Sequence, residues 1–558
     1  MKKLNGSQMI SEALKHEGVS VVFGYPGGAA LNIYDETYKQ DYFTHVLTRH
    51  EQAAVHAADG YARASGKVGV AFVTSGPGFT NAVTGLATAY ADSIPLVLIS
   101  GQVPLPLIGT DAFQEIDAVG ISRPCVKHNF LVKTIDELPR ILKEAFYIAR
   151  SGRPGPVHVD IPKDVTAAMG DFNYPSEIKM QTYKPNLKGH PNQIKKACEI
   201  ISKSKKPIVY LGGGAINSNA ADEARKFVYT ANIPTVETLM ALGTLRSDDE
   251  LNLGMVGMHG SYAANMALSE ADLIICLGAR FDDRVTGKLS EFAKNAKVIH
   301  VDIDPSSIGK IVNAEYPIVG DLKNVLMELN DKIDIQEGSF DPWIEQISIY
   351  KKLHPLTYKD SDEILKPQWV IQNLAKIAGD DAVIATDVGQ HQMWVAQFYP
   401  FTRPRQLLTS GGLGTMGYGL PAAMGAAWAV DVPVVAVSGD GGFLMNIQEL
   451  MTLAANKKRV INIILNNNFL GMVRQWQTFF YGERYSNTDL SIQPDFVKIC
   501  EGFGGKGFVA KTKDEFKNAL KEALKIDTVS VIEVKIDRFE NVLPMVPAGA
   551  AIYNMILE

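Results

Sequence analysis

The residues best placed to do chemistry are Gly439-Asp440-Gly441 and Asn466-Asn467, which follow the apolar segments 434–437 and 461–465. Asp440 offers an anionic oxygen and Asn467 a neutral carbonyl oxygen, and Mg²⁺ prefers oxygen ligands together with substrate phosphates. Ligands bind at the carboxyl ends of parallel strands, so the pattern predicts a magnesium and diphosphate site. Asp-Gly is also a common surface-turn dipeptide, but the Asn pair after the next strand favours a site.

These segments belong to a chain in which strand-like and helix-like stretches alternate, which predicts an α/β fold with parallel sheets. We expect three domains, at 1–168, 190–330 and 366–545, joined by polar linkers from Met169 to Asn192 and from Asp331 to Pro367. The first and third domains look like variations on one architecture. Helices should flank each sheet, and the middle domain should be Rossmann-like.

Composition places the chain among ordinary globular proteins. Its 558 residues are 46% hydrophobic and 21% charged, and the net charge of −6 gives no reason to expect nucleic acid or an anionic membrane as a partner. Four widely spaced cysteines predict free thiols in a reducing cytosol. The N-terminus lacks an apolar signal region and no apolar run reaches about 18 residues, so we expect a cytoplasmic protein without membrane spans.

Glu51 is a second candidate for chemistry. It follows His50 and begins a helical pattern, Gln52 to Ala58. A carboxylate at this place most simply stabilises a helix N-terminus through the helix dipole. The residue type and position alone leave both interpretations open.

Five segments carry a family resemblance: Phe-Gly-Tyr-Pro-Gly-Gly at 23–28, Arg-His-Glu-Gln-Ala-Ala at 49–54, Ala-Phe-Gln-Glu at 112–115, Arg-Phe-Asp-Asp-Arg-Val-Thr-Gly at 280–287 and Leu-Gly-Met-Val-Arg-Gln-Trp at 470–476. The chain resembles enzymes dependent on thiamine diphosphate (TPP). Within them it resembles the catalytic large subunits of acetohydroxyacid synthases, also called acetolactate synthases. The resemblance covers essentially the whole length. It implies a pyrimidine-binding domain, a middle FAD-binding domain and a diphosphate-binding domain, in that order.

The resemblance assigns catalytic roles to residues of the first domain. Glu51 is expected to hydrogen-bond the aminopyrimidine ring of TPP and so to activate the cofactor. Gln114 is expected to polarise the substrate, and Gly28 to offer a backbone amide near the reacting carbonyl. Lys163 and Phe113 are expected to line the entrance.

The resemblance also implies the residues that hold TPP and its metal. Met416 is the expected wedge that bends the cofactor, although methionine most often simply packs in a core. The third Mg²⁺ ligand is expected to be the backbone carbonyl of Phe469, beside Asp440 and Asn467. The other expected TPP contacts are Val388, Gly389, Gln390, His391, Gly414 and Gly441.

FAD is implied for the middle domain, with a mainly structural role. The glycine triplet Gly212-Gly213-Gly214 follows an expected strand and offers backbone N–H groups to a phosphate, although a tight turn would need glycine anyway. Asp302 lies at another strand end, where it could bind a ribose hydroxyl. The further FAD contacts implied by the resemblance are Arg153, Thr238, Leu239, Met240, Gly257, Met258, His259, Gly278, Arg280, Asp282, Ile303 and Asp321.

Two residues are expected to choose the substrate. Arg284 can bind the carboxylate of a 2-keto acid bidentately, although an ion pair with Asp282 or Asp283 on the surface is the simpler alternative. Trp476 would pack against the alkyl group of the acceptor, with Met258 beside it, and one methylene is worth about 1–3 kcal/mol of discrimination.

The implied reaction begins the synthesis of valine, leucine and isoleucine. Pyruvate is decarboxylated, and its two-carbon unit is joined to a second pyruvate, giving 2-acetolactate, or to 2-ketobutyrate, giving 2-aceto-2-hydroxybutyrate. A homodimer or homotetramer is implied because the Glu and the diphosphate motif act from different subunits in this superfamily, and a small regulatory subunit is expected. The alternatives are pyruvate oxidase, another TPP-dependent 2-keto acid decarboxylase or carboligase, and a non-catalytic protein on the same scaffold. Glyoxylate carboligase lacks a Glu at the position of Glu51.

Overall fold

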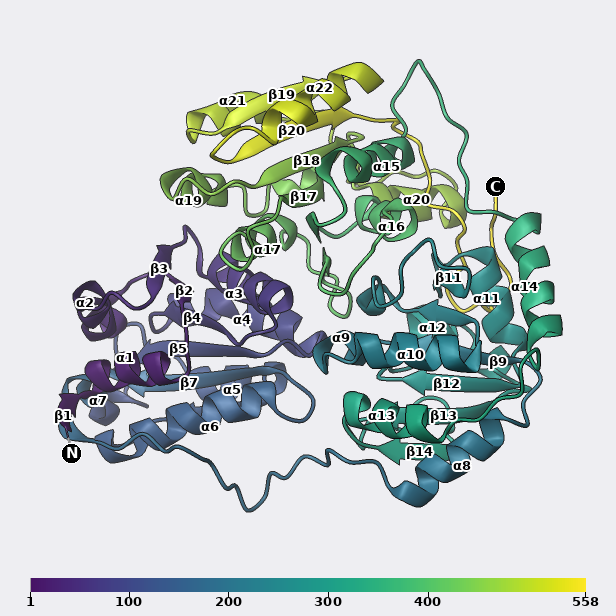
Figure 1. Cartoon of the computed structure of the whole chain (residues 1–558). Coiled ribbons are helices and arrows are strands. Elements are labelled where there is room, and N and C mark those ends of the chain that lie inside the picture. The colour runs from purple at the N-terminus through teal and green to yellow at the C-terminus, as the bar shows by residue number, and fades with distance from the viewer. Residues whose placement is uncertain (1) are drawn as a thin grey trace.

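The computed structural model describes residues 2–558 as three α/β domains, each built on a six-stranded sheet with all strands parallel (Figure 1). The predicted fold class is therefore confirmed. None of the helices in this range is long and apolar enough to cross a membrane.

The N-terminal sheet has the strand order β3-β2-β4-β5-β7-β6. Its strands are β2 (Val21–Gly24), β3 (Thr44–Leu47), β4 (Gly69–Val73), β5 (Leu96–Gln102), β6 (His128–Leu131) and β7 (Pro156–Pro162). The helices around it are α1 (Gly6–His16), α2 (Leu31–Lys39), α3 (Glu51–Ser65), α4 (Pro77–Ala91), α5 (Ala118–Ser122), α6 (Leu138–Arg150) and α7 (Lys163–Ala167).

The middle sheet has the order β11-β10-β9-β12-β13-β14. Its strands are β9 (Pro207–Leu211), β10 (Thr235–Glu237), β11 (Asn252–Met255), β12 (Leu273–Leu277), β13 (Lys297–Asp302) and β14 (Tyr316–Val319). The accompanying helices are α8 (Pro191–Ile201), α9 (Gly214–Asn217), α10 (Ala221–Ala231), α11 (Tyr262–Glu270), α12 (Asp283–Thr286), α13 (Leu322–Lys332) and α14 (Asp341–Leu353).

The C-terminal sheet has the order β16-β15-β17-β18-β20-β19, which repeats the N-terminal pattern of second, first, third, fourth, sixth and fifth strand. The two outer domains therefore share one topology. The strands are β15 (Val383–Thr386), β16 (Leu407–Leu408), β17 (Val434–Gly439), β18 (Ile461–Asn466), β19 (Lys506–Ala510) and β20 (Ser530–Lys535). The helices are α15 (Pro367–Ala378), α16 (Gln390–Phe398), α17 (Gly419–Ala426), α18 (Asp440–Phe443), α19 (Glu449–Ala455), α20 (Gly471–Phe480), α21 (Phe496–Gly502) and α22 (Lys513–Ala523).

Both expected linkers contain regular structure, so the sequence prediction was wrong there. The first opens with β8 (Met169–Phe172), which pairs antiparallel with β1 (Lys2–Asn5) and so belongs to the N-terminal domain. The second contains α14, whose Trp343 is buried and donates from Nε1 to the carbonyl of Pro207 at 3.0 Å. Pro342 is compatible with this helix, because it stands in the first helical turn, where no backbone N–H is needed.

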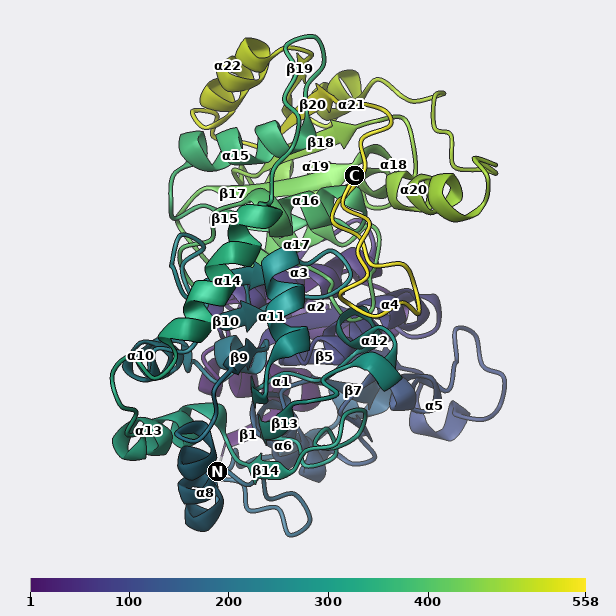
Figure 2. The same ribbon diagram turned by 90° about the vertical axis from the view of Figure 1, so that its right-hand side faces the viewer.

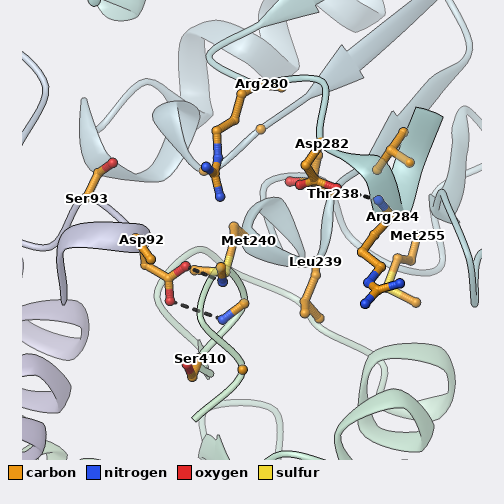
Figure 3. Close-up of a pocket in the computed structure, with 18 of the residues that line it drawn as sticks. Asp92, Ser93, Thr238, Leu239, Met240, Met255, Arg280, Asp282, Arg284 and Ser410 are labelled. Atoms are coloured by element: carbon orange, nitrogen blue, oxygen red, sulfur yellow. Dashed lines mark hydrogen bonds between the residues drawn. The ribbon is translucent and has the colours of Figure 1, made fainter. Parts of the chain in front are cut away.

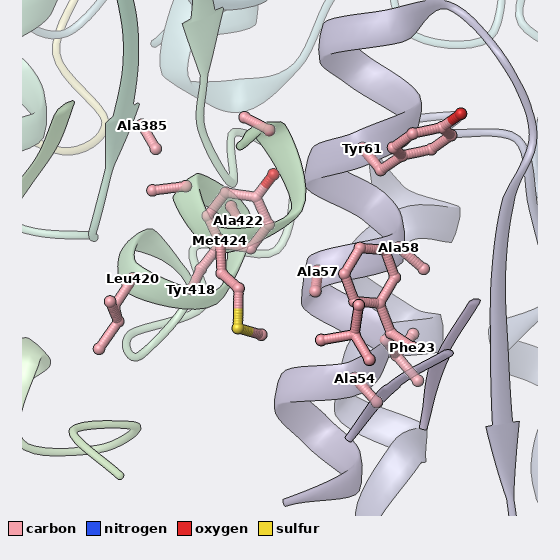
Figure 4. Close-up of a cluster of buried hydrophobic side chains, with 14 of the residues drawn as sticks. Phe23, Ala54, Ala57, Ala58, Tyr61, Ala385, Tyr418, Leu420, Ala422 and Met424 are labelled. Atoms are coloured by element: carbon pink, nitrogen blue, oxygen red, sulfur yellow. The ribbon is translucent and has the colours of Figure 1, made fainter. Parts of the chain in front are cut away.

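The outer domains share one hydrophobic core, in which α3 packs against α17 (Figure 4). Small residues make this contact close. A Cβ on Gly60 of α3 would lie 2.2 Å from the carbonyl oxygen of Ala422. The N- and C-terminal domains are thus held in a single arrangement by backbone-to-backbone packing.

The segment after β20 returns from the C-terminal domain to the middle domain, where it passes α12 (Figure 2). The backbone N–H of Val546 donates to the carbonyl of Met258 at 2.8 Å, and that of Lys288 donates to Ala550 at 3.0 Å. The end of the chain therefore spans two domains beside the loop that holds Met258.

Candidate functional site

A cavity of about 1330 Å³ lies between the three domains, and all three contribute to its wall (Figure 3). Asp92 and Arg153 come from the N-terminal domain, Arg280 from the middle domain, and Met416 and Trp476 from the C-terminal domain. Small-molecule pockets usually enclose roughly 300–1,000 Å³. The space is therefore large enough for more than one ligand group.

The residues expected to contact FAD are gathered along this cavity. Fifteen of the sixteen line its wall, and only Gly257 does not. Gly257 adopts φ +116°, and a Cβ there would lie 2.7 Å from the carbonyl oxygen of Arg284. It therefore shapes the loop behind the cavity, where Met258 donates its backbone N–H to the same carbonyl at 2.7 Å.

The glycine triplet is explained in part by chain crossing. A Cβ on Gly212 would lie 2.3 Å from the carbonyl oxygen of Gly278, and one on Gly214 2.7 Å from its Cα. The turns after β9 and β12 pass so closely that both positions require glycine. The tight-turn explanation therefore holds, and the same closeness leaves backbone exposed along the cavity wall.

Charged groups line the part of the cavity between the N-terminal and middle domains. The Arg153 guanidinium donates to Ser93 Oγ at 2.8 Å and pairs with Asp304 at 3.2 Å. Burial raises the pKa of Asp302 to about 6. Cationic and hydroxyl-binding groups therefore stand together, as a phosphate and a ribose would require.

Arg284 is not engaged in a strong ion pair. Its side chain is 61% exposed, and its nearest carboxylate partner is Asp283, at 3.8 Å. Asp282 instead caps α12 by accepting from the backbone N–H of Arg284 at 3.0 Å. An exposed pair of this length contributes under about 1 kcal/mol. The guanidinium thus remains available at the cavity wall for another carboxylate.

Trp476 lies on α20, half-buried, and lines the cavity together with Met258 and Met472. Its ring meets that of Phe480 edge-on, with centroids 5.7 Å apart. Together Met472 and Trp476 of the C-terminal domain and Met258 of the middle domain give the cavity an apolar surface.

The predicted metal residues lie at the ends of two paired strands. β17 and β18 are adjacent and parallel, with Gly439 opposite Leu465. Asp440 and Asn467 therefore follow neighbouring strand ends, as the sequence predicted. Asp440 is 1% exposed, so the surface-turn alternative is wrong.

Asp440 and His391 each have a buried polar atom that lacks a hydrogen-bond partner. Asp440 Oδ1 accepts no hydrogen bond, while Oδ2 accepts from Gln493, and burial raises the pKa of the carboxyl to about 7. His391 Nε2 is also unpaired. A Cβ on Gly389 or Gly439 would lie 2.9 or 3.0 Å from its ring, and burial lowers the pKa of His391 to about 3. Unpaired buried groups are costly, so their presence fits a bound cation and an anionic ligand.

The loop after β18 presents oxygens rather than further carboxylates. Asn467 Oδ1 accepts from the backbone N–H of Phe469 at 3.1 Å, and Asn468 is left-handed with φ +56°. No group of three His, Cys, Asp or Glu in residues 2–558 could hold a metal. A metal here would depend on one carboxylate, neutral oxygens and a ligand phosphate, which suits Mg²⁺.

Of the remaining residues expected to hold TPP and its metal, four line the cavity and six lie outside its wall. Val388, Gly389, Gly414 and Met416 line it. The residues outside its wall are Gln390, His391, Asp440, Gly441, Asn467 and Phe469.

Five predicted residues of the N-terminal domain lie away from this cavity: Glu51, Gly28, Gln114, Lys163 and Phe113. Glu51 opens α3 and accepts from Asn81 Nδ2 at 3.0 Å. A Cβ on Gly76 would lie 2.7 Å from the Gln114 carbonyl, and one on Gly78 3.4 Å from the Glu51 carboxylate.

The structure thus places Glu51 and Gln114 around one glycine turn, after β4. Phe113 is 88% exposed in the neighbouring loop. Lys163 begins α7, and Gly28 begins a short 3-10 helix with open space around it.

Sequence reasoning missed Asp92, at the end of α4. Its carboxylate pairs with buried Arg63 at 2.8 Å and accepts from the backbone N–H groups of Gly411 and Gly412 at 3.1 and 2.7 Å (Figure 3). Asp92 therefore holds the loop that leads to Gly414 and Met416. No local pattern marks it, because its two glycine partners lie 319 and 320 residues away.

Comparison with known proteins matches the chain, domain by domain, to one family of enzymes. Residues 4–121, 194–329 and 387–534 match the N-terminal TPP binding, central and C-terminal TPP binding domains of thiamine pyrophosphate enzymes. The acetolactate synthase large subunit of Haemophilus influenzae is 48% identical over 100% of this chain and 99% of its own length. The chain belongs to the acetolactate synthase large-subunit family. The isozyme 3 large subunit of Escherichia coli is 47% identical over 100% of this chain and 99% of its own, and the Mycobacterium bovis acetolactate synthase 49% over 99% and 91%.

Family membership relates the two groups of residues to one cofactor. Acetolactate synthase large subunits are TPP-dependent enzymes, and Glu51 lies within the matched N-terminal TPP binding domain. Asp440, Asn467 and His391 lie within the matched C-terminal one. Both groups lie outside the wall of the cavity that Met416 and Trp476 line.

Proposed function

We propose that this chain is the catalytic subunit of an acetolactate synthase. It decarboxylates pyruvate and joins the two-carbon unit to a second pyruvate, giving 2-acetolactate, or to 2-ketobutyrate, giving 2-aceto-2-hydroxybutyrate. The observation that carries the proposal is the single cavity in which Arg284, Trp476 and Met416 meet. The cavity combines the exposed Arg284 guanidinium, which can bind a carboxylate, with an apolar wall for an alkyl group and the edge of the TPP site.

Mg²⁺ is proposed to join the diphosphate of TPP to the protein through Asp440, Asn467 and the carbonyl of Phe469. The unpaired Asp440 Oδ1 supports this assignment. FAD is proposed for the part of the cavity between the N-terminal and middle domains, since fifteen predicted contacts line it. The net reaction passes no electrons to an acceptor, so the flavin is proposed to have a structural role and not to react.

When bound, TPP supplies the electron sink for decarboxylation and carbon–carbon bond formation. The protein groups position the reactants. Arg284 binds the carboxylate of the second 2-keto acid, Trp476 packs against its alkyl chain, and Glu51 holds a proton at the aminopyrimidine ring. Neutral His391 offers a hydrogen bond without adding charge beside the diphosphate.

A second copy of the chain is proposed to complete the site. Glu51 and Gln114 lie outside the cavity of their own chain, whereas four other residues expected to contact TPP line it: Val388, Gly389, Gly414 and Met416. A homodimer can bring the exposed Phe113 loop of one copy to the cavity of the other. A homotetramer would contain two such pairs. A small regulatory subunit is proposed as a further partner because the H. influenzae and E. coli relatives are named large subunits.

The test is a product assay of purified protein with TPP, Mg²⁺, FAD and mixed pyruvate and 2-ketobutyrate. We expect acetolactate and acetohydroxybutyrate, with no electron acceptor consumed. Acetate or peroxide as the main product would instead identify a pyruvate oxidase and would falsify the proposal. Protein stripped of flavin and assayed without added FAD should be less active. Sedimentation of the stripped protein shows whether it still assembles, which separates loss of activity from loss of assembly.

A further inference from the structure

Gln475 is a fully buried amide on α20, one residue before Trp476. Its Oε1 accepts from the backbone N–H of Val542 at 2.8 Å and from Gln390 Nε2 at 2.9 Å. Its Nε2 donates to the carbonyl of Val542 at 3.0 Å. Gln475 does not line the cavity, so it cannot act by touching a ligand there.

Gln390 continues the chain of amides towards the metal loop. Its Nε2 also donates to the carbonyl of Glu540 at 3.0 Å, and its Oε1 accepts from Asn467 Nδ2 at 3.1 Å. Both N–H donors of the Gln390 side chain are therefore occupied, and only its backbone N–H is left to donate to a diphosphate. Asn467 in turn accepts from the backbone N–H of Phe469.

The backbone at each end fixes the orientation of all three amides. At one end, the N–H and carbonyl of Val542 require the oxygen and the nitrogen of Gln475, respectively. At the other end, the N–H of Phe469 requires the oxygen of Asn467. An amide turned over at any of the three positions would oppose donor to donor or acceptor to acceptor. We call these three hydrogen-bonded side chains, Gln475, Gln390 and Asn467, the relay. The relay holds the nitrogen of Asn467 towards Gln390 and keeps its oxygen for Phe469 and a cation.

We propose that Gln475 is a positioning residue that acts through Gln390 to orient the metal ligand Asn467. It also fixes the position of Trp476 relative to Asn467. The inference deepens the proposed function and rests on it for the roles of Asn467 and Trp476. It links metal affinity and acceptor choice, because Gln475 and Trp476 are neighbours on one helix. Arg474 also holds this helix, donating to Asn541 Oδ1 at 2.7 Å and, at 2.6 Å, to the carbonyl of Glu540 that Gln390 also contacts.

The experiment titrates TPP-saturated protein with Mn²⁺, used in place of Mg²⁺, and measures free Mn²⁺ by electron paramagnetic resonance. Gln475→Met keeps the size of the side chain but makes none of the relay hydrogen bonds. Gln397→Met is the matched control, since Gln397 on α16 donates to the carbonyls of His259 and Leu543 at 2.9 and 3.2 Å and contacts no relay residue. Product ratios are measured in parallel with mixed pyruvate and 2-ketobutyrate.

We expect Gln475→Met to raise the Mn²⁺ dissociation constant about tenfold, the low end for loss of a group that orients a metal ligand. It should also lower the share of acetohydroxybutyrate. Gln397→Met should change neither. Gln475→Glu keeps an oxygen for Gln390 and Val542, so its Mn²⁺ affinity should fall between wild type and Gln475→Met.

An unchanged Mn²⁺ dissociation constant in folded Gln475→Met overturns the proposal, and so does an equal loss in Gln397→Met. If Gln475→Met does not fold, the comparison of Gln475→Glu with Gln397→Met decides by the same titration. If wild-type protein binds Mn²⁺ but makes no acetolactate, the proposed function is contradicted and the relay is not. The relay is then tested by the Mn²⁺ dissociation constants of the variants. Wild-type protein that binds no Mn²⁺ with TPP overturns the relay as well.

Discussion

Gly425 of α17 lies so close to α3 that a Cβ on it would stand 1.8 Å from the carbonyl oxygen of Ala57. Together with Gly60 facing Ala422, this contact sets how the N- and C-terminal domains meet. The residues for TPP lie on both of these domains. The helix crossing therefore determines where Glu51 and Asp440 face within one chain.

Gly425→Ala should destabilise the protein. The added methyl group cannot be accommodated without moving one helix backbone, and overpacking of a core costs about 1–3 kcal/mol. Denaturant unfolding measures the change in the free energy of unfolding. Gly502→Ala is the control, because a Cβ there meets nothing within 4 Å in α21. Equal stability of the two variants would contradict the close-packing argument.

Trp476→Leu should lower the preference for 2-ketobutyrate over pyruvate about tenfold while acetolactate formation survives. The smaller side chain loses contact with the extra methylene of the acceptor. A competition assay with both 2-keto acids gives the ratio. Trp428→Leu serves as a control, since Trp428 packs near Phe23 and is not part of the cavity wall. An unchanged ratio in Trp476→Leu would exclude this role.

Removal of divalent metal should abolish activity, and Mg²⁺ should restore it, since the Asp440 carboxylate and the diphosphate are both anionic and need a cation between them. The measurement is the rate of acetolactate formation in excess chelator and after Mg²⁺ is added back. Flavin absorbance should not change, because the residues proposed for FAD include none of the proposed metal ligands. Full activity in excess chelator would show that the metal assignment is wrong.

Asp160→Asn should change how stability depends on pH. Asp160 is buried in β7, where Ser100 and Gln102 donate to it, and burial raises the pKa of its carboxyl to about 7. An unfolded Asp has a pKa of about 3.9. The folded state therefore binds the proton more tightly, and this contribution to the free energy of unfolding is present below about pH 4 and lost as pH rises through about 7.

The asparagine variant has no such proton, so its free energy of unfolding should fall less than that of wild type between pH 5 and pH 8. The difference in slope should not exceed about 1.4 kcal/mol per pH unit. Denaturant curves at both pH values measure it, with the exposed Asp431→Asn as control. Parallel pH dependences of wild type and Asp160→Asn would rule out the assignment.

Local patterns predicted the sheet architecture well. The strands β17 and β18 lie where runs of apolar residues were found, because a buried parallel strand needs apolar side chains on both faces. The linkers were mistaken for a related reason. Proline and glycine mark both loops and helix starts, so Pro342 could not reveal α14 without the buried contact of Trp343.

By itself, the sequence determined the chemistry that single strand ends can offer. Asp440 and Asn467 follow adjacent parallel strands, and their types and spacing are enough to indicate a cation and a diphosphate. Only the tertiary structure decided what surrounds them. Asp92 reaches Gly412 across 320 residues, and Glu51 lies outside the cavity of its own chain. Such relations depend on how whole domains pack, and packing between distant segments leaves no periodic trace in the chain.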